Sequence, residues 1–288
     1  MRNLILGIDA GNHFAKAAGA YGVDIYRTAI CDWFARDIVE RHGNDDMEFE
    51  LNGRRGFAGT VAANEDQFGV TSLYGDTKAH EDTLIRVLLA IYRYTSKYYL
   101  TDIERFSIVC SQPIISHTTD EKAKMSALLR GTHDITISGI DKRITIEEVG
   151  VTAEGSVAFL SNPQMGEIRV IDIGSGTVNC ATIRNKLHIN NASRTFNFGT
   201  ETVGNSASLS EMSRGIIRAT TSLKWRKNDA VYVCGGVAND ILPLIKAHYS
   251  NAKLMTPFIR TADGIITSVS PVYANAVGNY EVARRTYR

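Results

Sequence analysis

The sequence lacks the features by which several classes of protein are recognised. None of its apolar runs reaches the roughly 18 residues that a membrane-spanning helix needs, and the short apolar stretch after Met1 is unlike a signal peptide because it ends in an aspartate. The four cysteines are far apart, with no CxxC pair to suggest a zinc site. We therefore expect a cytoplasmic protein with buried reduced thiols and no membrane association.

Strong charge and clustered histidines are also missing. The formal net charge is only +1, so no field of the whole molecule favours nucleic acid, and DNA association would need a local patch or an adaptor. Seven histidines are scattered without an HxH or HxxxH pair, which argues against a histidine metal site. The chain has 288 residues, of which 44% are hydrophobic, enough for one large domain or two compact ones.

Apolar periodicity predicts alternating strands and helices. In the first half, a helix is expected over 81–99, because Leu84, Val87, Leu88, Ile91 and Tyr92 recur at three- and four-residue spacing and would share one buried face. Asn52-Gly53 predicts a hairpin turn. Further strands are expected at 4–9, within 17–30, at 49–59 and at 106–112, and a helix from Thr118 to about Gly131. In the second half we expect helices at about 152–160, 202–225, 239–249 and 274–285, and strands at 168–174, 178–184 and 230–236.

The two halves repeat one motif: a buried strand, an aspartate, a glycine turn and a second strand. This predicts two related α/β domains packed around a cleft, over residues 1–150 and 151–288.

The first copy of the motif contains Asp9, the turn Gly11-Asn12 and Lys16. A glycine lets backbone N–H groups approach a phosphate without interference from a Cβ atom. Lys16 either supplies a point charge to the β- or γ-phosphate or orients the turn. Asp9 is placed to hold a hydrated Mg²⁺ ion.

The second copy runs from Asp172 through Gly174, Ser175 and Gly176 to Thr177. It offers the same aspartate for Mg²⁺, with two glycines and two hydroxyls for phosphate oxygens. Neither copy is a Walker loop or a GxGxxG fingerprint. One such turn is usually structural, but two copies in corresponding places predict a site for a nucleoside triphosphate and its metal ion.

A third glycine turn follows the apolar run 231–234. Gly235 and Gly236 would let a flat base or ribose lie against the backbone, close to the N-terminus of the next helix. A plain strand-to-helix turn is the alternative.

These three elements, in this order, resemble the phosphate and adenosine motifs of the actin-like ATPase superfamily (actin, Hsp70-type chaperones and sugar kinases). The hairpin over 49–62 and the closing segment over 270–278 are similar to the plasmid-segregation actins of the ParM/StbA group. The resemblance implies an actin-like (ribonuclease H-like) two-domain ATPase fold with a nucleotide cleft between the halves. It also implies a small IB subdomain over about 20–80, ATP or GTP with Mg²⁺ as ligands, and a catalytic glutamate that matches Glu154.

One departure from the family is visible. Only about 20 mostly polar residues separate Thr182 from the helix expected near Thr202, where conventional actins insert the IIB subdomain. The chain therefore resembles shortened plasmid actins of the AlfA type, and a neighbouring subunit could complete the nucleotide site.

The leading hypothesis is an ATPase that polymerises into filaments and moves plasmid DNA through a DNA-binding adaptor on the plasmid centromere. A small-molecule kinase would need an aspartate base and a larger substrate insert, and a chaperone-like or regulatory ATPase would carry a further domain. Neither feature is visible in the sequence.

Overall fold

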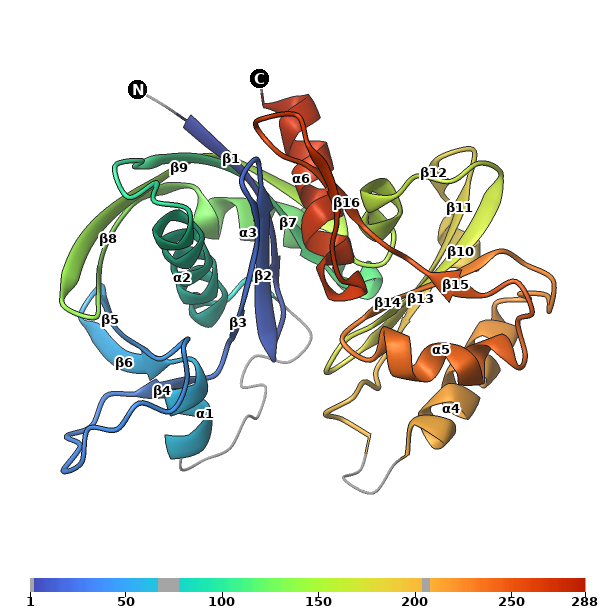
Figure 1. The fold of residues 1–288 in the computed structure, drawn as a ribbon, viewed down its shortest axis with the longest axis horizontal. Coiled ribbons are helices and arrows are strands. Elements are labelled where there is room, and N and C mark those ends of the chain that lie inside the picture. The colour runs from blue at the N-terminus through green and yellow to red at the C-terminus, as the bar shows by residue number, and fades with distance from the viewer. Residues whose placement is uncertain (1–2, 67–77, 204–207, 288) are drawn as a thin grey trace.

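The computed structural model describes residues 3–66, 78–203 and 208–287. Two large sheets lie side by side, and the last helix, α6 (Ala274–Thr286), stands between them (Figure 1). A small third sheet is formed by β16 (Phe258–Arg260) and β17 (Ile266–Ser268). This is the mixed α/β architecture that the sequence predicts.

The first sheet has nine strands in the order β3-β2-β1-β7-β9-β8-β5-β6-β4. β1 pairs antiparallel with β2 and parallel with β7, and β7 pairs parallel with β9. The predicted hairpin turn between β5 and β6 is confirmed, since Asn52 and Gly53 have positive φ values of 52° and 82°. The strands are β1 (Asn3–Ala10), β2 (Phe14–Gly19), β3 (Gly22–Arg27), β4 (Ile30–Asp32), β5 (Met47–Leu51), β6 (Arg54–Ala58), β7 (Arg105–Gln112), β8 (Gly131–Ile137) and β9 (Ile140–Ala153).

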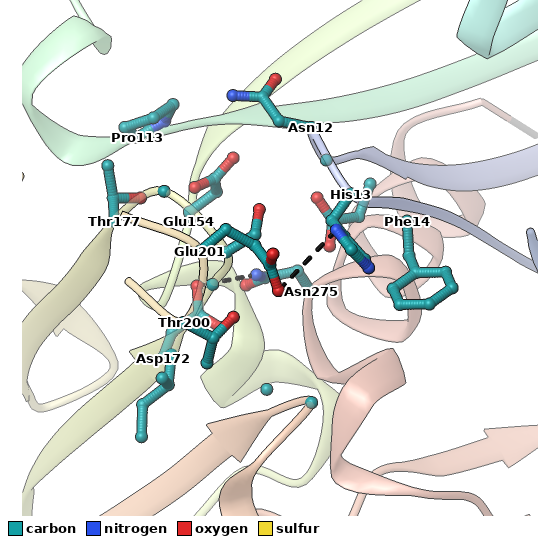
Figure 2. Close-up of a pocket in the computed structure, with 18 of the residues that line it drawn as sticks. Asn12, His13, Phe14, Pro113, Glu154, Asp172, Thr177, Thr200, Glu201 and Asn275 are labelled. Atoms are coloured by element: carbon teal, nitrogen blue, oxygen red, sulfur yellow. Dashed lines mark hydrogen bonds and ion pairs between the residues drawn. The ribbon is translucent and has the colours of Figure 1, made fainter. Parts of the chain in front are cut away.

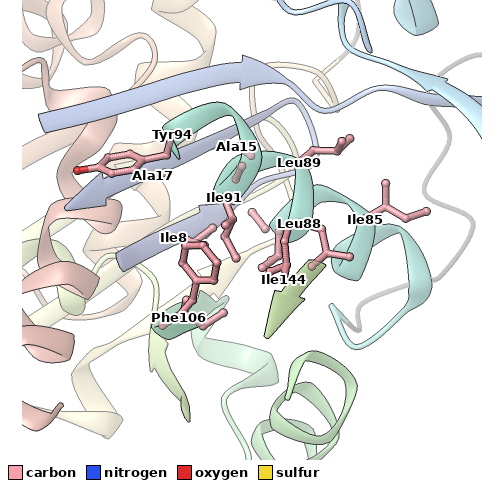
Figure 3. Packing of buried hydrophobic residues seen from close by; sticks show 14 of the residues in the cluster. Ile8, Ala15, Ala17, Ile85, Leu88, Leu89, Ile91, Tyr94, Phe106 and Ile144 are labelled. Atoms are coloured by element: carbon pink, nitrogen blue, oxygen red, sulfur yellow. The ribbon is translucent and has the colours of Figure 1, made fainter. Parts of the chain in front are cut away.

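Helix α2 (Glu81–Lys97) packs inside the curve of the first sheet (Figures 1 and 3). Four residues of its predicted apolar face, Leu84, Val87, Leu88 and Ile91, are buried in the core that the strands also line, and the fifth, Tyr92, is partly buried against that core. Burial of one such side chain contributes about 1.5–3 kcal/mol. Two more helices belong to this half, α1 (Thr60–Glu65) and α3 (Thr119–Leu129).

The second sheet has the order β12-β11-β10-β14-β15, with β13 also paired to β11. β10 pairs antiparallel with β11 and parallel with β14, and β14 pairs parallel with β15. The first sheet shows the same sequence of pairings from β3 to β9, so the repeat expected from the two glycine turns is present in the topology. The strands are β10 (Glu167–Ile173), β11 (Val178–Arg184), β12 (Leu187–His188), β13 (Arg194–Phe196), β14 (Val231–Gly235) and β15 (Lys253–Leu254).

Two helices, α4 (Leu209–Ser222) and α5 (Ala238–Lys246), pack against the second sheet. The prediction that α4 starts near residue 202 was wrong. Ser208 is its N-cap and forms a capping box with Glu211, so the helix begins at Leu209. The described residues contain no helix long and apolar enough to cross a bilayer. Within the described ranges there are also four short 3₁₀ helices: η1 (Ile114–Ser116), η2 (Val157–Ser161), η3 (Asn190–Ala192) and η4 (Pro271–Tyr273).

The expected helix over 152–160 was also wrong. β9 continues through Ala153, where it still pairs with β7, and η2 begins only at Val157. Between them lies a turn with Gly155 at a φ of 69°. The sheet pairing outweighs the local helical pattern here, and it places Glu154 in a turn rather than on a helix.

Helix α6 contacts both halves through two glycines. A Cβ atom at Gly7 on β1 would come within 2.0 Å of the Tyr280 amide nitrogen, and one at Gly278 would come within 2.0 Å of the Val157 carbonyl oxygen. Because neither position has room for a side chain, the helix lies directly against β1 on one side and η2 on the other.

All four cysteines are free thiols, and Cys110, Cys180 and Cys234 are buried.

Candidate functional site

The two aspartates of the repeated motif occupy equivalent places. Asp9 is the second-last residue of β1 and lies opposite Lys16 on β2. Asp172 is the second-last residue of β10 and lies opposite Asn179 on β11. Each glycine turn therefore sits at the end of a hairpin whose first strand also pairs with a parallel neighbour.

The turns border one cavity of about 560 Å³, within the range of small-molecule sites. Figure 2 shows side chains from both halves pointing into it. Every site residue predicted from the sequence lines this cavity, although their chemical roles stay predictions: Asp9, Gly11, Asn12, Lys16, Glu154, Asp172, Gly174, Ser175, Gly176, Thr177, Gly235 and Gly236.

Several polar contacts hold the first turn. Lys16 Nζ donates to Asp9 Oδ2 at 3.1 Å, and Arg86 Nη1, from α2, donates to Asn12 Oδ1 at 3.1 Å. Both Lys16 and Asp9 are largely buried. This ion pair holds Lys16 beside Asp9, and both expectations for Lys16, a charge for the phosphate or orientation of the turn, stay predictions.

The second turn presents backbone donors. The Gly174 amide donates to the Thr177 carbonyl at 2.9 Å and closes the turn. Among the described residues, the amides of Ser175 and Gly176 have no hydrogen-bond acceptor, although both residues line the cavity. A Cβ atom at Gly176 would have only Asn12 Nδ2 within 4.0 Å, so the space beside this backbone is open. Such amides suit an anionic oxygen.

Asp172 is buried and surrounded by other polar groups. Its Oδ2 accepts from Asn275 Nδ2 at 3.0 Å, and Cys234 Sγ lies 3.7 Å from its Oδ1. Burial, followed by the neighbouring charge of Glu154, raises the pKa of Asp172 to about 6. A cation placed at this carboxylate would relieve that cost.

Glu154 is buried in the turn between β9 and η2, and both of its oxygens accept hydrogen bonds. Lys78 Nζ lies 2.5 Å from Oε1, and Asn179 Nδ2 lies 2.9 Å from Oε2. The Glu154 amide donates to the Gln112 carbonyl at 2.8 Å, and the Gly155 amide donates to Asn275 Oδ1 at 3.0 Å. The carboxylate is therefore fixed in the cavity wall.

The third glycine turn contains two glycines in different surroundings. Gly235 has a φ of 104°, and a Cβ atom there would come within 2.1 Å of the Ile173 carbonyl oxygen. A Cβ atom at Gly236 would have nothing within 4 Å. Gly235 thus allows β14 to approach the second turn, whereas Gly236 leaves open space in the cavity.

The short segment after β13 forms part of the cavity wall. Asn197, Thr200, Glu201 and Thr202 line it, and a Cβ atom at Gly199 would come within 2.4 Å of the Ser175 carbonyl oxygen. Between β11 and α4, the described residues hold only β12, η3 and β13 and no further subdomain. This matches the expected absence of the IIB subdomain, and the segment after β13 folds back over the second turn.

Sequence reasoning missed several lining residues. Lys78 and Asn275 contact the predicted acids but belong to no glycine turn. His13 Nδ1 lies 3.9 Å from Glu201 Oε1, a contact between the two halves that Figure 2 marks with a dashed line. Asn275 lies inside the closing segment over 270–278 and His13 lies within the first glycine turn, whereas Lys78 is next to no sequence signal.

The donor set fits magnesium in a nucleotide complex. Among the described residues, no three His, Cys, Asp or Glu side chains lie close enough to enclose a metal ion by themselves. Mg²⁺ commonly keeps several waters and binds through one or two carboxylates and substrate phosphates. The buried Asp9 and Asp172 line the same cavity as the open backbone at Gly176, and they match that requirement.

Comparisons with known proteins bear on the fold. A family profile described as the N-terminal domain of actin-like proteins matches residues 7–156. No curated protein sequence matches the chain. A filament of AlfA from the B. subtilis plasmid pLS32 is similar in structure, with a TM-score of 0.77, 20% identity, and coverage of 96% of this chain and 97% of the other. An AlfA filament bound to AMPPNP has a TM-score of 0.74 at 19% identity, covering 96% and 95%. The apo psk41 ParM protein has a TM-score of 0.71 at 18% identity, covering 99% and 98%.

Proposed function

This chain belongs to the family of actin-like proteins, and we propose that it binds and hydrolyses a nucleoside triphosphate and assembles into filaments that segregate plasmid DNA. The observation that carries this proposal is the shared cavity, where two equivalent glycine turns and a buried glutamate meet. The turns would hold the phosphates, and the space beside Gly235-Gly236 would receive the base and ribose. Plasmid segregation would take place in the cytoplasm.

Asp9 and Asp172 would hold Mg²⁺, directly or through water. The ion would neutralise charge on the phosphates. Asn275 would orient the Asp172 carboxylate, to which it already donates a hydrogen bond. Lys16 would keep Asp9 in place, since the two side chains form an ion pair in the cavity wall.

Glu154 would orient the attacking water. The water oxygen attacks the γ-phosphorus, the bond from that phosphorus to the bridging oxygen breaks, and the electron pair leaves with the nucleoside diphosphate. The carboxylate accepts a hydrogen bond from the water and takes up its proton as the new bond forms. The amides of Ser175 and Gly176 would donate to phosphate oxygens as charge develops.

Filament assembly is supported by the likeness to solved AlfA filaments over nearly the whole of both chains. The net charge of +1 gives the chain no strong field for DNA, so we propose that plasmid DNA is held through a DNA-binding adaptor at its centromere.

Assembly can be tested with purified full-length protein by light scattering, pelleting and electron microscopy. We expect filaments with ATP and Mg²⁺, and loss of assembly when EDTA removes the metal or when nucleotide is omitted. A parallel series with GTP would establish which base is preferred. If neither nucleotide produces a pelletable polymer at concentrations well above those in cells, the filament function is wrong.

The two glycines of the third turn should respond differently to alanine. Gly235→Ala should lower the free energy of unfolding by about 2–4 kcal/mol, because the new Cβ atom would meet the Ile173 carbonyl and φ is positive. Gly236→Ala should change it by less than about 0.5 kcal/mol but weaken nucleotide binding, because its Cβ atom would enter the cavity. Urea unfolding and titration with a fluorescent nucleotide measure the two effects. Equal stability losses would contradict this assignment.

A further inference from the structure

Lys78 is a buried lysine that the repeated glycine motifs do not include. It lies between α1 and α2 and lines the cavity from the first half of the molecule. Its Nζ atom is 2.5 Å from Glu154 Oε1 and 3.4 Å from the carbonyl oxygen of Ala10, at the end of β1. One ammonium group therefore connects the glutamate to the strand that carries the first glycine turn.

The other oxygen of Glu154 is held from the second half. Asn179 Nδ2, on β11, donates to Glu154 Oε2 at 2.9 Å. The orientation of this amide is fixed, because Thr195 Oγ1 donates to Asn179 Oδ1 at 2.7 Å. The Glu154 carboxylate thus has one partner from each side of the cavity, and its plane is set by both together.

We propose that Lys78 is a positioning residue for hydrolysis, which holds the Glu154 carboxylate in the orientation that receives the attacking water. This inference rests on the proposed hydrolysis. An ammonium group has three donors, of which two are directed at Glu154 and Ala10, so one is left for the attacking water. Lys78 then acts through Glu154, and its removal should affect the chemical step more than nucleotide binding.

The contact with Glu154 also keeps Lys78 positively charged. Burial by itself would lower the pKa of Lys78, but the charges of Glu154 and Asp9 outweigh burial and hold the pKa above its usual value. Lys78 is therefore a cation at neutral pH. Without it, Asn179 would be the only described side chain that donates to the carboxylate, and the group could rotate away from the water.

The test compares Lys78→Met with wild type at a protein concentration that supports assembly, with phosphate release normalised to pelleted protein. We expect kcat to fall about 10–100-fold while KM and the affinity for a fluorescent ATP analogue change less than about threefold. Lys78→Arg keeps the charge and should recover most of the rate. Lys124→Met is the matched control, because Lys124 also pairs with a glutamate, Glu121, but at the exposed surface. Its kcat should equal that of wild type.

The double variant Lys78→Met/Glu154→Gln separates a positioning role of Lys78 from other roles. It also removes both charges of the pair, so it can be measured even if Lys78→Met alone, which leaves the Glu154 charge unpaired, fails to fold. It should hydrolyse ATP no more slowly than Glu154→Gln, because Lys78 acts through the glutamate. Additive losses, or a loss of affinity at unchanged kcat, would show that Lys78 binds phosphate directly and overturn the inference. An unchanged kcat in Lys78→Met would overturn it and leave the proposed function standing. If the wild-type protein does not hydrolyse ATP, both the role of Lys78 and the proposed hydrolytic function are wrong.

Discussion

Replacing Glu154 by glutamine is expected to slow hydrolysis about 100- to 1,000-fold while nucleotide binding persists. The amide cannot take a proton from the attacking water, and it cannot accept hydrogen bonds from both Lys78 and Asn179 as the carboxylate does. Phosphate release after rapid mixing with ATP and Mg²⁺ measures the effect. Polymers of the variant should also last longer after dilution, because the proposed trigger for disassembly is hydrolysis.

The matched control is Glu148→Gln. Glu148 lies on the same strand, β9, but pairs with Arg130 at the surface, so the variant should hydrolyse ATP at the wild-type rate. Unchanged phosphate release by Glu154→Gln would remove the glutamate from the mechanism, and equal losses in both variants would indicate a general effect on β9.

Replacing Asp172 by asparagine is expected to have two effects of opposite sign. Affinity for the Mg²⁺–nucleotide complex should fall about 100-fold, because the carboxylate proposed to hold the metal is lost. The nucleotide-free protein should become more stable. Burial raises the pKa of Asp172 from 3.8 to about 6, so its ionisation at neutral pH costs the folded state about 3 kcal/mol.

The pH dependence fixes the sign of the second effect. Because the pKa of Asp172 is higher in the folded state, wild-type stability should fall as pH rises from about 4 to about 6, and this contribution should be constant above that range. Asp172→Asn should therefore gain about 1–3 kcal/mol at pH 7 and little at pH 4, measured by urea unfolding. Asp240→Asn, at an exposed position on α5, is the control. A variant less stable than wild type at pH 7 would contradict the cost assigned to the buried charge.

The short segment after β13 forms part of the wall of the proposed nucleotide site, and the expected contribution of a neighbouring subunit stays a prediction. The absence of a lid subdomain suggested that a neighbouring subunit completes the nucleotide site. In the structure, Asn197 and Thr200–Thr202 already line the cavity, and Glu201 approaches His13 across it. The chain thus closes part of this wall by itself.

The sequence by itself determined the elements whose signals are local. The apolar spacing of Leu84, Val87, Leu88 and Ile91 predicted helix α2, because residues three and four apart share one helical face. Asn52-Gly53 predicted its hairpin, since both residues tolerate positive φ. The two strand–aspartate–glycine turns predicted the repeat, because each is a short continuous segment whose conformation depends little on distant residues.

Only the tertiary structure decided the contacts between distant residues. Lys78 and Glu154 are 76 positions apart, and Asp172 and Asn275 are 103 apart. No periodicity or turn preference connects such pairs, because they are brought together by sheet pairing and by the packing of α6 between the halves. The same long-range pairing of β9 with β7 kept Thr152 and Ala153 extended and placed Glu154 in a turn, against the helix that local pattern predicted.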